Sequence, residues 1–103
     1  MNNPEQATLP IQSDSDLRES PYSGLSFVGG SPAAPELWRP QRSNDYTADN
    51  DTGREYARDL LSRIAERSSP PMLGHVCRAI IEAGSFGGVE IGFFHQIAEA
   101  AAG

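Results

Sequence analysis

The sequence predicts an all-α fold, in which a small three-helix domain over residues 48–103 follows a largely disordered or extended N-terminal arm over residues 1–47. A chain of 103 residues supports one such domain at most. Six of its eight prolines lie in the first forty residues, where no apolar period persists. In the second half, apolar residues recur at helical spacing between recognisable start and stop signals.

The arm mixes proline with Ser, Asn, Asp and Gly, a composition that buries too little apolar surface to offset the entropy of ordering. Two short apolar pieces interrupt it. The first contains Phe27 within the run Tyr22–Val28, and the second contains Trp38 within PELWRP. Either piece could fold back onto the neighbouring domain, or both could form a docking arm that orders on a partner. Deletion of residues 1–40 is expected to leave a folded domain.

The first helix is expected to begin at Thr52, because Thr52 followed by Glu55 matches a capping box. Apolar residues then repeat at helical spacing as far as Ala65, and the run Ser68–Pro71 ends the helix.

The second helix is expected over residues 70–83, with Ser69 as its N-cap and Gly84 as a left-handed C-cap. Leu73, Val76, Cys77, Ile80 and Ile81 form its apolar stripe. Gly74 inside this helix lowers its stability by about 1 kcal/mol relative to alanine. A close backbone contact would explain why glycine occupies this position.

The third helix, Val89 to Ala102, carries an apolar arc of roughly 200°, whereas a helix on one neighbour needs about 100°. A three-helix bundle could absorb the whole arc as core. We favour the interpretation that the arc is divided between the domain core and another protein. An uncovered phenylalanine loses about 2 kcal/mol of stabilisation, and exposed apolar patches usually mark interaction sites. In this interpretation Ile91, Phe94, Ala98 and Ala101 pack inside the domain. The predicted partner or dimer interface consists of Val89, Phe93 and Ile97, with Trp38 and Phe27 from the arm.

Composition excludes several kinds of chemistry. All eight basic residues are arginine, so lysine-dependent Schiff-base chemistry is absent. The net charge of −6 gives no electrostatic reason to bind a phosphate backbone, and a single cysteine forms no intramolecular disulfide. No apolar run approaches the roughly 20 residues of a membrane span, and the N-terminus lacks the features of a secretory signal. We expect a cytoplasmic protein.

His75, Cys77 and His95 are the residues that invite a metal or nucleophile. On one helix His75 and Cys77 lie about 200° apart and cannot share an ion, and further ligands at metal spacing are missing. A Cys77–His95 pair has no orienting carboxylate or oxyanion hole in the neighbouring sequence. A helix-turn-helix would use the third helix for recognition, but that helix carries Glu90 and Glu99 without Lys or Arg. Neither an enzyme, a cofactor, a metal nor direct nucleic acid binding is expected.

Three stretches, DTGREYARDLL, LGHVCRAIIEAG and FGGVEIGFFHQIAE, together resemble the QslA family of small Pseudomonas-type proteins, the LasR-specific quorum-sensing antiactivators. The similarity covers about residues 51–100 and leaves the arm unmatched. It implies a protein that binds the ligand-binding domain of a LuxR-type, LasR-like transcription factor. Occupation of that factor's dimerisation surface would prevent DNA binding and transcription activation. The resemblance also implies a homodimer, and it assigns no partner contact to an individual residue.

Two other functions remain open. One is a phage- or plasmid-borne protein inhibitor, such as an antitoxin or anti-defence protein, that acts by protein–protein binding. The other is a small hydrolase that uses Cys77 and His95.

Overall fold

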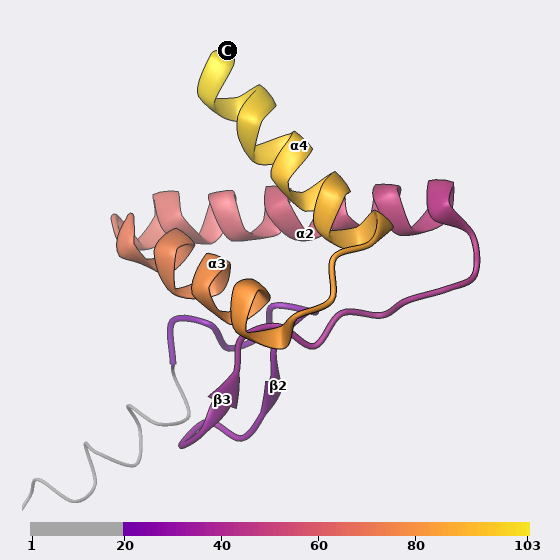
Figure 1. The fold of residues 1–103 in the computed structure, drawn as a ribbon. Coiled ribbons are helices and arrows are strands. Elements are labelled where there is room, and N and C mark those ends of the chain that lie inside the picture. The colour runs from indigo at the N-terminus through magenta and orange to yellow at the C-terminus, as the bar shows by residue number, and fades with distance from the viewer. Residues whose placement is uncertain (1–19) are drawn as a thin grey trace, which may run out of the picture.

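The computed structural model describes residues 20–103, in which three helices follow a short two-stranded hairpin (Figure 1). The antiparallel strands are β2 (Gly29–Gly30) and β3 (Pro35–Glu36), with Gly29 opposite Glu36. The helices are α2 (Tyr46–Arg67), α3 (Pro71–Ala83) and α4 (Gly88–Ala102). The predicted three-helix fold is therefore confirmed. The first nineteen residues of the predicted arm lie outside the described residues.

Helix α2 begins earlier than its sequence predicts. The carboxylate of Asp45 accepts hydrogen bonds from the backbone N–H groups of Thr47 and Ala48, which makes Asp45 the N-cap. The predicted start at Thr52 is wrong, because Thr52 lies inside the helix and its hydroxyl donates to the Ala48 carbonyl, 3.0 Å away. The predicted boundary between residues 47 and 48 therefore falls in the first turn of α2.

The other helix ends lie close to their predicted positions. Ser68, with a φ of 51°, ends α2, and Gly84, with a φ of 79°, ends α3 as predicted. At the start of α3 the N-cap is Pro70 and no side chain caps the helix, so the predicted cap at Ser69 is wrong. Helix α4 begins one residue before its predicted start.

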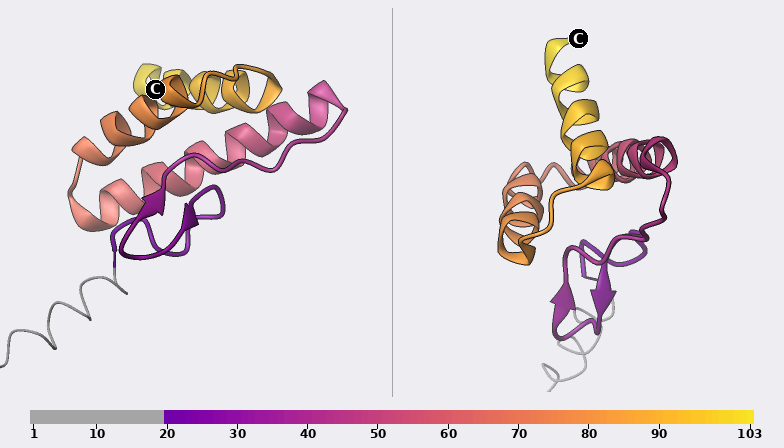
Figure 2. Two further views of the ribbon diagram at one scale, coloured as in Figure 1. Left: turned by 60° about the horizontal axis from the view of Figure 1, so that its bottom comes forward. Right: turned by 45° about the vertical axis from the view of Figure 1, so that its right-hand side comes forward.

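Helices α2 and α4 cross at a contact built on glycine. A Cβ atom on Gly53 would lie 1.9 Å from the Val89 carbonyl oxygen, and one on Gly92 would lie 2.1 Å from that of Asn50. Only glycine permits two helix backbones to approach so closely. Beyond this crossing, the C-terminal end of α4 projects away from α2 (Figures 1 and 2).

The segment over residues 20–44, which we call the strap, runs along one side of the helices and completes their core (Figure 2). The ring of Phe27 lies 5.4 Å from that of Trp38 and 5.3 Å from that of Tyr56, and Trp38 lies 5.2 Å from Phe93. The interpretation that these apolar pieces fold back onto the domain is therefore confirmed. The buried core consists of Leu25, Phe27, Trp38, Tyr56, Ala57, Leu60, Met72, Val76, Ile80, Val89 and Phe93.

Within residues 20–103, no helix combines the length and apolar character that a membrane span requires.

Candidate functional site

The residues predicted to meet a partner lie mainly inside this chain's own core. Val89, Phe93 and Phe27 have no exposed surface, Trp38 is also buried, and Ile97 is partly buried against the core. The predicted outward orientation of Val89 and Phe93 is therefore wrong, and so is the prediction of an interface at Phe27 and Trp38. The side of α4 that carries Gly88 and Gly92 faces α2, so Val89 and Phe93 point into the core, where Phe27 and Trp38 of the strap cover them.

The opposite side of α4 faces solvent. It carries the four residues predicted to pack inside, Ile91, Phe94, Ala98 and Ala101, which we call the α4 seam. Ile91, Ala98 and Ala101 are exposed, and Phe94 is partly buried. The apolar surplus of the third helix therefore exists, but on the side opposite to the one predicted.

A second exposed apolar row lies on α3. His75, Ala79 and Glu82 line a groove shared with the strap, which places Leu73, Cys77 and Ile81 on the side of α3 away from the strap. Ile81 is 76% exposed, while Leu73 and Cys77 are partly buried.

Phe86, in the loop between α3 and α4, is a further exposed apolar residue beside the α4 seam. It is 63% exposed and stacks on Phe94, with ring centroids 5.8 Å apart and planes inclined by 15°. We use the name outer face for these exposed and partly buried apolar residues taken together; they are Leu73, Cys77, Ile81, Phe86 and the α4 seam. Contiguous exposed apolar surface is typical of interaction sites, and the stacked rings of Phe86 and Phe94 are the contiguous part that the structure shows.

A buried carboxylate joins the strap to α4. Glu90 has no exposed surface, and its oxygens accept hydrogen bonds from the indole of Trp38 at 2.8 Å and the backbone N–H of Gly87 at 2.8 Å. The guanidinium of Arg42 donates two more, at 3.0 and 2.5 Å. Burial by itself raises the pKa of Glu90, but these hydrogen bonds outweigh it and lower the pKa to about 2. In the sequence, the only sign of this site is a carboxylate inside an otherwise apolar arc.

Further polar contacts hold the strap along its length. Arg63 donates to the backbone carbonyls of Pro21 and Ser23, at 2.6 and 2.8 Å. The hydroxyl of Tyr56 accepts from the backbone N–H of Gln41 at 3.0 Å. The strap is therefore fixed to α2 as well as to α4.

His75 and His95, the two histidines considered as catalytic or metal-binding candidates, each contact a different side chain. Nδ1 of His75 lies 2.9 Å from the hydroxyl of Tyr22, and Nδ1 of His95 lies 3.0 Å from the guanidinium of Arg54. Burial raises the pKa of the Cys77 thiol, which disfavours the nucleophilic thiolate. Among residues 20–103, His, Cys, Asp and Glu form no group of three that could hold a metal ion.

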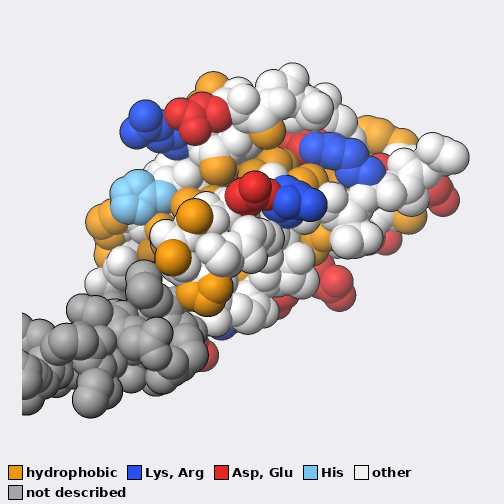
Figure 3. All heavy atoms as spheres, turned by 90° about the horizontal axis from the view of Figure 1, so that it is seen from below, with side chains coloured by type: hydrophobic (Ala, Val, Ile, Leu, Met, Phe, Trp, Pro, Cys, Tyr) orange, Lys and Arg blue, Asp and Glu red, His pale blue; other side chains and the backbone are white. Residues whose placement is uncertain are grey.

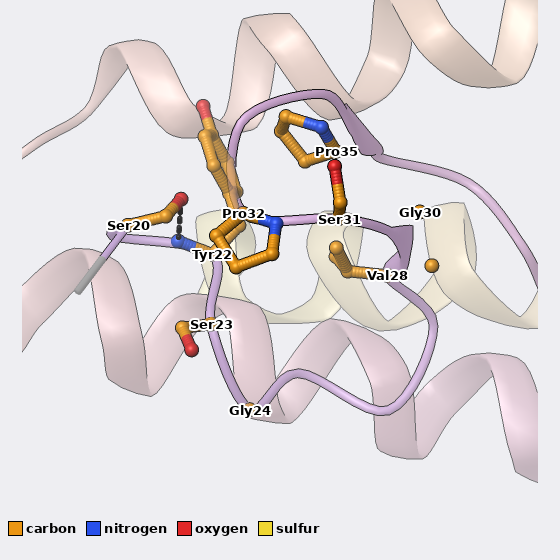
Figure 4. A pocket seen from close by; sticks show the side chains of 10 residues that line it. Ser20, Tyr22, Ser23, Gly24, Val28, Gly30, Ser31, Pro32 and Pro35 are labelled. Carbon is orange, nitrogen blue, oxygen red and sulfur yellow. Dashed lines mark hydrogen bonds between the residues drawn. The ribbon is translucent and has the colours of Figure 1, made fainter. Parts of the chain in front are cut away.

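Two concavities border the hairpin. A pocket of about 150 Å³ beside the strap is lined by serine, glycine, proline, Tyr22 and Val28, without a charged side chain (Figure 4). A groove of about 490 Å³ between the strap and α3 contains four charged residues. They form two local ion pairs, Arg39 with Glu36 and Arg78 with Glu82.

Over residues 20–103, the face seen from below, where the strap lies, mixes both signs of charge with apolar atoms, and its arginines do not gather into a basic patch (Figure 3). Both arginines of the groove are thus paired with carboxylates rather than directed at an open anion site. The outer face remains the strongest candidate for function.

Comparison of the chain with protein-family models, with curated proteins and with solved structures finds no match.

Proposed function

We propose that this chain is a non-catalytic protein-binding module that acts in the cytoplasm as a quorum-sensing antiactivator. Its partner is the ligand-binding domain of a LuxR-type, LasR-like transcription factor. The three stretches that resemble the QslA family support the identity of the partner, and the exposed outer face supports binding through apolar contact.

The single observation that carries the binding mode is the exposure of large apolar side chains on the outer face. Ile81 and Phe86 lie 76% and 63% exposed on neighbouring elements. Burial of one such side chain in an interface contributes about 1.5–3 kcal/mol. A partner that covers both would gain enough to make them the anchors of the contact.

Inhibition by such a module needs no catalysis. A transcription factor that must dimerise to bind DNA is inactivated when a second protein binds its monomer. The monomer–dimer equilibrium of the transcription factor then shifts toward the monomer, by a factor set by the inhibitor concentration relative to the dissociation constant of the inhibitor complex. The acidic charge of the chain, −6, also prevents direct competition for the DNA backbone.

A gel-shift assay with a LuxR-type regulator and its operator DNA tests this proposal. The wild-type protein in excess should dissolve the regulator–DNA complex. Ile81→Asp should weaken this effect at least tenfold, because it places a charge in the apolar contact. Ser62→Asp, which adds the same charge at an exposed position of α2 outside the outer face, should act like the wild type. A regulator–DNA complex that persists at excess wild-type protein contradicts the proposal.

A further inference from the structure

We infer that Arg58 of α2 and Gln96 of α4 together bind a carboxylate group. They belong to a polar cluster beside the crossing of the two helices, and this cluster includes no residue of the outer face. The inference therefore does not depend on the proposed regulator. The cluster consists of Asn50, Arg54, Arg58, His95, Gln96 and Glu99.

Arg54 holds the polar cluster together. Its Nε donates a hydrogen bond to the side-chain oxygen of Asn50 at 3.3 Å. Its Nη1 donates to Gln96 and Glu99, at 3.2 and 3.0 Å, and its Nη2 lies 3.0 Å from Nδ1 of His95. The side chain of Arg54 is only 23% exposed. Because each of its nitrogens already has a partner, Arg54 connects α2 to α4 and is not itself the ligand site.

The amide of Gln96 has a fixed orientation. Its oxygen accepts hydrogen bonds from two guanidinium groups, at 3.2 Å from Nη1 of Arg54 and 3.1 Å from Nη1 of Arg58. A guanidinium only donates, so the amide must present its oxygen, and not its nitrogen, to both arginines. The amide nitrogen is bonded to the same carbon as this oxygen, which places its two N–H groups beside Arg58. Among residues 20–103 these N–H groups have no acceptor.

The charge of Arg58 has no counter-ion in the part of the chain that the structure describes. Arg58 is exposed, and there its guanidinium bonds to Gln96 alone. The carboxylate of Glu99 offsets the charge of Arg54. Most other arginines of residues 20–103 also form ion pairs with carboxylates; these are Arg39, Arg42, Arg63 and Arg78.

This arrangement is complementary to a carboxylate. Two guanidinium groups that share one acceptor oxygen repel each other, and an anion beside Arg58 relieves the repulsion. A carboxylate has two oxygens, so it can accept from the guanidinium of Arg58 and from the amide nitrogen of Gln96 at the same time. A phosphate dianion would bring a second negative charge next to Glu99 in a chain of net charge −6. The carboxylate can belong to an Asp or Glu side chain of another protein or to a small organic acid.

Heteronuclear NMR of the isotope-labelled full chain tests the inference, with a titration of sodium acetate against sodium chloride at equal ionic strength and neutral pH. The side-chain N–H signals of Gln96 and Arg58 should shift with acetate and saturate. Those of Gln41, an exposed glutamine of the strap, should not. Phosphate at the same concentrations should bind more weakly than acetate. A capped peptide with one glutamate separates the two sources, because it should bind more tightly than acetate if the ligand is a protein side chain and equally if it is a small acid.

Substitution of two arginines of α2 provides the matched comparison. Arg58→Gln should weaken acetate binding about tenfold, because it removes the charge of the site. Arg67→Gln should bind acetate like the wild type, since Arg67 is also exposed on α2 but lies outside the polar cluster. Gln96 signals that respond to acetate no more than those of Gln41 overturn the inference. An equal response in Arg58→Gln and the wild type, or tighter binding of phosphate than of acetate, also overturns it.

Discussion

The two sides of α4 carry similar amounts of apolar side chain but differ in the residues between them. The inner side places Val89 and Phe93 beside Gly88 and Gly92, and there the backbone of α2 comes into direct contact. The outer side places Ile91 and Phe94 beside alanines and faces solvent. The difference shows that small residues, rather than the largest apolar ones, determine which side of this helix packs within the domain.

Substitution of the two adjacent phenylalanines should separate the sides most sharply. Phe93→Asp buries an unpaired carboxylate among Phe27, Trp38 and Phe94, and it should unfold the domain, with a loss of more than about 4 kcal/mol. Phe94→Asp removes a partly exposed ring and should cost about 1–2 kcal/mol while the helices persist. Circular dichroism at 222 nm during urea unfolding measures both. If both variants lose helicity equally, the distinction between the two sides is wrong.

The glycine contact itself should be the next most sensitive point. Gly92→Ala places a methyl group 2.1 Å from the Asn50 carbonyl oxygen. The methyl carbon is bonded directly to the α4 backbone and the oxygen belongs to the α2 backbone, so neither atom can move away unless its helix moves. The helices must move apart, with an expected cost of about 3 kcal/mol. The midpoint of thermal unfolding should therefore fall by more than 10 °C, at about 4–8 °C per kcal/mol for a domain of this size. An unchanged midpoint would show that α2 and α4 do not cross in the close contact described here.

The number of helices and most of their ends follow from local signals. Gly84 has no side chain to oppose a left-handed cap, and the serine–proline run after Arg67 cannot continue a helix. These effects act within a few residues, so the sequence alone predicts them. The predicted apolar stripe of α3 is only half correct, because Val76 and Ile80 are buried whereas Cys77 is partly buried and Ile81 is exposed.

The start of α2 and the role of the strap depend on contacts between distant residues. Residues 46–53 contain Thr, Asp, Asn and Gly, which are weak helix formers, and these first two turns of α2 are stabilised where Gly53 and Asn50 meet α4. Phe27 and Trp38 lie among prolines and still enter the core, because four aromatic rings from the strap, α2 and α4 meet there. The removal of residues 1–40 should therefore unfold the domain, contrary to the expectation from composition.

The orientation of α4 was the part of the candidate site that periodicity could not determine. A 3.6-residue period locates an apolar arc but does not say which half faces the domain. The signal that does so is the pair Gly88 and Gly92, one helical turn apart, together with Gly53 in α2. Glu90 also fits only the inner side, since its partners Trp38 and Arg42 belong to the strap.

Acid should weaken the inner side specifically through Glu90. The pKa of this carboxyl is about 2 in the folded chain against 4.5 for the unperturbed group, so its contribution is fully present above pH 4.5 and disappears as the pH falls toward 2. The shift corresponds to about 3 kcal/mol of unfolding free energy. Urea unfolding followed by the fluorescence of Trp38, the single tryptophan, should measure this loss.

Glu90→Gln provides the control for the acid effect. It keeps the shape of the side chain but removes the charge, so it should be less stable than the wild type at pH 7. The difference between the two proteins should shrink as the pH falls below 4.5. A difference that stays constant from pH 7 to pH 3 contradicts the assignment of the low pKa to the contacts of Glu90.

The smallest expected effect concerns Gly74 in α3, which has the opposite surroundings to the glycines of the α2–α4 contact. A Cβ atom at this position would meet nothing within 4 Å, so the close backbone contact expected from the sequence is absent inside residues 20–103. Gly74→Ala should therefore stabilise the domain by up to about 1 kcal/mol, the difference in helix propensity, and raise the midpoint of thermal unfolding by a few degrees.

Gly74 follows Leu73 at the edge of the outer face, so the same variant also reports on partner binding. If it is more stable but binds the regulator as well as the wild type does, the contact does not extend to the first turn of α3. A variant that is less stable than the wild type would show instead that Gly74 has a packing neighbour in the folded chain.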